Sequence, residues 1–127
     1  MQQNNLFEYA VIRIVPRVER EEFLNAGVIL YCAKQRFLQV MFTVNEERIQ
    51  ALCGEINSKE ILQNLQALQR ICMGDSNAGP IAKLDLAGRF RWLTATRSTV
   101  IQSSKVHPGF CADPLQTLTR LYTQLVL

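Results

Sequence analysis

The chain of 127 residues has one histidine and one tryptophan, and it has no apolar run approaching the length of a membrane span. A helix that crosses a bilayer needs about 20 predominantly apolar residues. The first residues, M-Q-Q-N-N, are polar and have neither the basic nor the apolar region of a secretory signal. These absences predict a cytoplasmic protein that does not bind membranes.

The four cysteines, Cys32, Cys53, Cys72 and Cys111, are widely spaced, and no C-x-x-C pair occurs. A structural zinc site needs four Cys and His ligands at characteristic spacings, and the single His107 cannot complete that set. Separated cysteines in a reducing compartment are typically free and buried. We therefore expect no disulfide, no metal and no cofactor.

The chain also lacks the glycine spacing of a phosphate loop or of a dinucleotide-binding fingerprint. Its length predicts a single domain, residues 1–127. Charge is unevenly placed along it. Residues 1–60 carry seven basic and eight acidic side chains, a net of −1, whereas residues 61–127 carry seven basic and three acidic, a net of +4. An anionic partner is therefore expected at the second half.

Runs rich in β-branched and aromatic residues predict an antiparallel sheet of about four strands. Leu6 begins the first run, and Pro16 ends it because proline has no N–H to donate to a strand ladder. A polar turn separates the second run from the third, which predicts a hairpin. The predicted strands are residues 6–15, 27–32, 37–44 and 97–103. His107-Pro108-Gly109 is predicted to be a turn.

Helical spacing and capping residues predict the remaining elements. Asn45, Asn57 and Asp113 stand where an N-cap is expected, and Pro114 suits the first position of a helix. The predicted helices are residues 45–54, 57–73, 85–94 and 113–126. Together the elements predict an α+β fold in which the helices pack on one face of the antiparallel sheet.

The stretch from Arg89 to Gly109, R-F-R-W-L-T-A-T-R-S-T-V-I-Q-S-S-K-V-H-P-G, holds four basic residues and no acidic one. A guanidinium offers a rigid fork of donors to phosphate or carboxylate, and adjacent hydroxyls add further bonds. We predict an anion-binding surface formed by Arg97, Ser98, Thr99, Lys105 and His107. The competing interpretation is a strand whose polar side chains simply face water.

A bend at residues 102–104 would bring Arg97 and His107 together, and we predict that they lie close to each other. An imidazole is the side chain whose unperturbed pKa lies nearest neutrality, so His107 would serve as the acid or base of a small enzyme. Ser103, Ser104 and Cys111 are near it in sequence, but catalysis requires nearness in space. The alternative is that His107 only supports the predicted turn, and we assign no catalytic residue.

Asn25 and Gly27 are predicted to be structural: Asn25 bonds the backbone, and Gly27 allows a close approach at the entry to a strand. The charged residues 19–22 just before them are interpreted as solvated rather than metal-binding, because no companion ligand stands at a suitable spacing. Trp92 and Phe90 are interpreted as core residues. The alternative for them is a platform for stacking nucleic-acid bases.

Two segments resemble a known bacterial family. Residues 9–32, Y-A-V-I-R-I-V-P-R-V-E-R-E-E-F-L-N-A-G-V-I-L-Y-C, are similar to the opening of the family called domain of unknown function 3037. Residues 89–114 are similar to its closing segment. The resemblance implies no established activity. Relatives are often encoded beside a kinase-like protein of the persistence-factor type, which implies a protein partner.

The sequence leaves three functions open. We favour a non-enzymatic binding or accessory module that acts with a protein partner. A small hydrolase or phosphoryl-transfer enzyme using His107 is the second, and a nucleic-acid-binding domain using the basic second half is the third. An exposed apolar patch would favour the first, a deep pocket containing His107 the second, and a continuous basic stripe the third.

Overall fold

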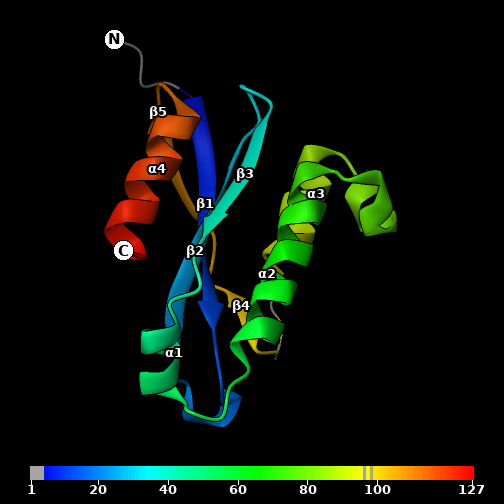
Figure 1. Cartoon of the computed structure of the whole chain (residues 1–127). Coiled ribbons are helices and arrows are strands. Elements are labelled where there is room, and N and C mark those ends of the chain that lie inside the picture. The colour runs from blue at the N-terminus through cyan, green and yellow to red at the C-terminus, as the bar shows by residue number, and fades with distance from the viewer. Residues whose placement is uncertain (1–4, 96, 98) are drawn as a thin grey trace.

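An antiparallel sheet of five strands forms the centre of the structure, a computed structural model that describes residues 5–95, 97 and 99–127 (Figure 1). Its strand order is β3-β2-β1-β4, and β5 also pairs with β1. The strands are β1 (Asn5–Ile14), β2 (Leu24–Cys32), β3 (Phe37–Phe42), β4 (Ile101–Ser103) and β5 (His107–Cys111). The predicted α+β class and antiparallel sheet are confirmed.

In this described part of the chain, four α-helices pack around the sheet: α1 (Glu46–Leu52), α2 (Ser58–Met73), α3 (Leu86–Leu93) and α4 (Pro114–Leu125). Three short 3-10 turns, η1 (Val18–Arg20), η2 (Ser76–Ala78) and η3 (Pro80–Lys83), lie in the connections. Each α-helix begins at an Asn or Asp whose side chain accepts a backbone N–H of the first turn: Asn45, Asn57, Asp85 and Asp113. These local signals explain why the helix boundaries were predictable.

The helices cover both faces of the sheet rather than one (Figure 1). On one face, α2 and α3 pack over a core that contains Ile12, Ile29 and Leu65. On the other, α4 packs through Leu118 against Val28 and its neighbours. The expectation of a single covered face is therefore wrong. Strands with apolar side chains on both faces need a layer on each side to exclude water.

Residues 107–109, predicted to be a turn, instead begin strand β5. His107 pairs with Tyr9, and Gly109 pairs with Phe7. Pro108 and Gly109 together are typical of a turn, which is why the sequence suggested one. β5 lies at the edge of the sheet beside β1, and an edge strand tolerates proline because one row of its N–H groups needs no partner.

Strands β4 and β5 follow the same side of β1, and residues 104–106 separate them. Residues 104–106 lie opposite only two residues of β1, residues 10 and 11. The one extra residue forms a bulge. Ser104 maintains the pairing there. Its N–H donates to the Val11 carbonyl at 2.8 Å, and its Oγ accepts the Val11 N–H at 2.8 Å. The hydroxyl thus takes the place of a backbone acceptor in the ladder.

A second bulge lies in β2, where Ala26 has no partner on β1. Gly27 follows it, and a Cβ added there would lie 2.6 Å from the carbonyl oxygen of Met41 in β3. Asn25 precedes it and donates through Nδ2 to the carbonyl of Leu125, at the end of α4, over 3.0 Å. Gly27 therefore lets β3 approach β2 closely, and Asn25 ties β2 to α4.

The four cysteines differ in their exposure. Cys32, Cys72 and Cys111 are buried, while Cys53 is partly accessible. Burial raises the pKa of Cys72 to about 12, because the thiolate loses its hydration there.

We therefore expect iodoacetamide at neutral pH to alkylate Cys53 first, and the three buried thiols only after unfolding. Peptide mass spectrometry of native and denatured samples measures this, and fast native labelling of Cys72 would contradict it.

Candidate functional site

A groove of about 330 Å³ opens on the surface between α2, α3 and the segment that leads into β4. We call it the α2–α3 groove. Most of its lining is apolar, and Asn64, Arg97 and Thr99 supply the polar groups. Its main lining residues are Leu68, Ile71, Trp92, Leu93, Arg97 and Val100.

The apolar wall on the α2 side arises because the apolar stripe of this helix is wider than its contact with the sheet. Ile61 and Leu65 are buried in the core between helix and sheet. Leu68 and Ile71 follow at helical spacing but are only half-buried. Part of the stripe therefore stays open to solvent and forms one side of the groove.

Trp92 lines the groove on the α3 side and is 39% exposed. Phe90, two residues earlier, is 3% exposed and stacks on Tyr31 with a centroid distance of 5.4 Å. Two residues apart on a helix point about 200° away from each other, so both rings cannot face the same core. The core interpretation is correct for Phe90 and wrong for Trp92.

Arg97 also lines the groove and is stacked on this tryptophan. Its guanidinium carbon lies 4.1 Å from the centroid of the Trp92 ring, and its Nη2 donates to the Trp92 carbonyl. The positive charge over the face of the ring is attracted by the ring quadrupole. The stack and the hydrogen bond together hold the guanidinium beside the apolar lining.

No carboxylate neutralises Arg97 within residues 5–95, 97 and 99–127. The two ion pairs of this part of the chain are Arg17–Glu55 and Arg20–Glu22, and none of these residues lines the groove. The described lining likewise contains no Asp or Glu. The groove therefore combines a mostly apolar lining with a cation that has no acidic partner among the described residues.

Two of the five predicted anion-binding residues, Arg97 and Thr99, meet in this groove. Thr99 donates its hydroxyl to the Ile101 carbonyl at 2.6 Å, which secures the segment before β4.

The structure does not place the other predicted residues of this stretch in the groove. Ser98 lies outside the described residues. Lys105 is exposed between β4 and β5 and does not line the groove. The predicted strand at residues 97–103 begins only at Ile101.

His107 lies on the opposite side of the sheet from the groove. Its ring packs on Tyr9 with a centroid distance of 5.3 Å, and Tyr9 contacts the core beneath α4. Arg97 stacks on Trp92 on the α2–α3 side. The predicted nearness of Arg97 and His107 is therefore wrong. Residues 104–106 do not reverse the chain, since β4 and β5 continue along the same side of β1.

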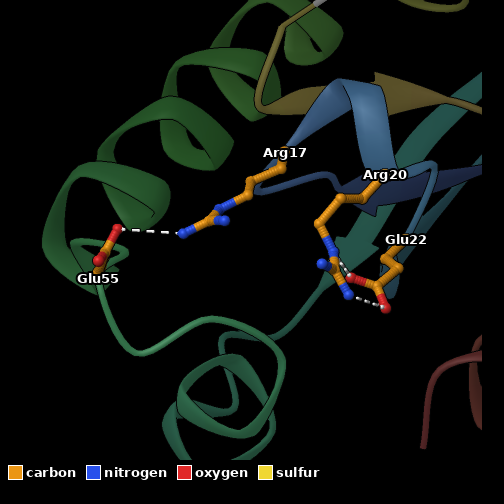
Figure 2. Close-up of polar contacts among 4 residues, drawn as sticks. All are labelled: Arg17, Arg20, Glu22 and Glu55. Carbon is orange, nitrogen blue, oxygen red and sulfur yellow. Dashed lines mark hydrogen bonds and ion pairs between the residues drawn. The ribbon is translucent and has the colours of Figure 1, made fainter.

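A second hollow, of about 460 Å³, is polar and lies where the loop after β1 faces the α1–α2 connection (Figure 2). Arg20 binds Glu22 through two hydrogen bonds of 2.6 and 3.3 Å, and Arg17 lies 3.4 Å from Glu55. The hydrogen bond from Arg20, followed by its charge, lowers the pKa of the Glu22 carboxyl. Both arginines are already paired with carboxylates, and these pairs are exposed to solvent. The hollow is therefore a weaker candidate for anion binding than the groove.

Metal-ligating side chains do not cluster in the part of the chain that the structure describes: no group of three or more His, Cys, Asp and Glu residues there is placed to hold an ion. Across the same residues, no helix combines the length and the apolar character that crossing a membrane requires.

The model of a family described as "Protein of unknown function (DUF3037)" matches residues 9–126, nearly the whole chain. Both sides of the α2–α3 groove lie within the match. The resemblance seen in residues 9–32 and 89–114 is thereby confirmed. No curated protein and no solved structure matches the chain.

Proposed function

We propose that this chain, which belongs to the DUF3037 family, is a binding module that holds a segment of a partner protein in the α2–α3 groove. The observation that supports this is the apolar lining of Leu68, Ile71 and Trp92 around an open cavity of about 330 Å³. Covering apolar surface is favourable by about 25 cal/mol per Å². Concave apolar sites with a few polar groups are where ligands typically bind.

The chemistry of the groove favours binding over catalysis. Its described lining offers a guanidinium, a hydroxyl and an amide, but no imidazole, thiol or carboxylate. Acid–base catalysis needs a group that gives or takes a proton near neutral pH. His107, the residue on which the enzyme alternative depends, lies on the other side of the sheet against Tyr9.

A phage-displayed library of random dodecapeptides, selected on the immobilised protein, tests the proposal. We expect selected peptides to bind the native protein and to lose at least tenfold in affinity for Leu68→Asp, because a carboxylate would then stand in the apolar lining. Leu62→Asp is the matched control, since Leu62 is exposed on the same helix and does not line the groove. Trp92, the only tryptophan of the chain, reports occupancy by its fluorescence.

Circular dichroism and thermal unfolding establish that both variants remain folded. If the selected peptides bind Leu68→Asp as tightly as they bind native protein and Leu62→Asp, the groove is not their binding site. A selection that yields no peptide dependent on Leu68 would equally contradict the proposed function.

A further inference from the structure

We infer that the segment held in the α2–α3 groove carries an aspartate or glutamate beside its apolar anchor, and that Arg97 binds this carboxylate. The inference rests on the proposed function, because it specifies the chemistry of the occupant of the same groove. It starts from one juxtaposition: a guanidinium stacked on the Trp92 ring, both of which line a mostly apolar cavity.

The guanidinium is oriented before any partner arrives. It stacks on Trp92 at 4.1 Å and gives one N–H to the Trp92 carbonyl, while a guanidinium has five N–H donors in all. A side chain already held in place loses little conformational entropy when it forms a further bond. The planar fork matches a carboxylate, which accepts two parallel hydrogen bonds from it.

Covering the groove is what makes the carboxylate necessary. A segment that packs on Leu68 and Ile71 also removes water from Arg97, which lines the same groove. A buried charge without a partner is costly, and no carboxylate of the described chain lies within ion-pair distance of Arg97. A purely apolar or a basic segment would leave that charge uncompensated. An acidic residue on the occupant compensates it and therefore sets the specificity.

The charge of the surrounding chain points the same way. Residues 61–127, which supply the whole described lining, have a net charge of +4. Arg91 lies on the same helix as Trp92 and is exposed, so it adds to the positive potential near the groove without lining it. Such a potential attracts acidic segments over a Debye length of about 8 Å at physiological ionic strength.

A double-mutant cycle on the selected peptides tests the inference. The probes are one acidic dodecapeptide from the selection and its Asp→Asn or Glu→Gln form, each labelled with fluorescein and titrated by anisotropy against native protein, Arg97→Gln and Arg91→Gln. We expect removal of the peptide carboxylate to weaken binding to native protein about tenfold, in the range of a charge-assisted hydrogen bond. Arg97→Gln should weaken the acidic peptide to a similar extent and should leave the affinity of the neutral peptide unchanged. Arg91→Gln should change either affinity less than twofold.

The outcomes separate the two proposals. Selected peptides without acidic residues, or an equal loss of both peptides in Arg97→Gln, would overturn the carboxylate inference and leave peptide binding in the groove intact. If peptide binding does not depend on Leu68, the proposed function itself is overturned. Should Arg97→Gln disturb the fold, the change made on the peptide still measures the carboxylate with native protein. Arg97→Lys, which keeps the charge without the fork, should then retain part of the preference for the acidic peptide.

Discussion

Replacing Gly27 with alanine is expected to lower the free energy of unfolding by about 3 kcal/mol, the upper end of the usual cost of overpacking a core site. The added Cβ would lie 2.6 Å from the Met41 carbonyl oxygen and 2.9 Å from the Cβ of Phe42. Both atoms belong to β3, and Phe42 pairs directly with Gly27. Relieving the contact requires β2 and β3 to separate, which strains bonds such as that from the Thr43 N–H to the Ala26 carbonyl at 2.9 Å.

Gly54→Ala is the matched control for this substitution. A Cβ at Gly54 meets only the flexible end of Gln50 at 3.8 Å, so its stability should stay within about 1 kcal/mol of native or rise slightly, since alanine restricts the unfolded chain. Urea unfolding followed by circular dichroism and by Trp92 fluorescence measures both variants. If Gly27→Ala proves as stable as Gly54→Ala, β3 can move away from β2 without losing its pairing.

Local signals account for the parts of the fold that the sequence predicted. The caps at Asn57 and Asp113 act on N–H groups two or three residues away, so their effect is visible in a short window of sequence. The start of β2 was less visible. The strand begins at Leu24, three residues before the predicted start. The prediction missed these residues because a bulge at Ala26 interrupts the alternation, so that Gly27 looks like the first strand residue.

The number of covered faces depends on contacts that are distant in sequence. β1 is buried through Ala10, Ile12 and Ile14 toward α2 and through Phe7 toward α4. The apolar residues on both of its faces were a sign of two helical layers. Which helix supplies the second layer is decided by packing between segments about 100 residues apart, and no short-range pattern shows that.

The sequence predicts only part of the groove, because its walls come from segments that are distant in sequence. The basic, hydroxyl-rich stretch identified Arg97 and Thr99, which do line the groove. Its apolar wall comes from Leu68 and Ile71 on α2, whose exposure is set by how far the helix stripe exceeds its contact with the sheet. The placement of His107 beside Arg97 is wrong because the expected bend at residues 102–104 does not reverse the chain, and β4 and β5 continue along the same side of β1.

Replacing Ser104 with alanine is expected to lower the free energy of unfolding by about 2 kcal/mol, even though the change removes a single oxygen atom. Ser104 is 6% exposed, and its Oγ accepts the N–H of Val11, itself buried, at 2.8 Å. The same hydroxyl donates to the Lys105 carbonyl at 2.9 Å. Without it the Val11 N–H is a buried donor lacking an acceptor, which costs about 1–3 kcal/mol.

Ser103→Ala provides the matched control one residue earlier in the chain. The Ser103 hydroxyl donates to the Ser104 carbonyl at 2.8 Å, but the side chain is only partly buried, so water replaces the bond and the loss should stay below about 1 kcal/mol. Amide hydrogen exchange gives the local measurement, because the Val11 N–H should lose protection in Ser104→Ala and keep it in Ser103→Ala. Equal stability of the two variants, with Val11 protected in both, would show that the bulge between β4 and β5 is held by its backbone and not by the Ser104 hydroxyl.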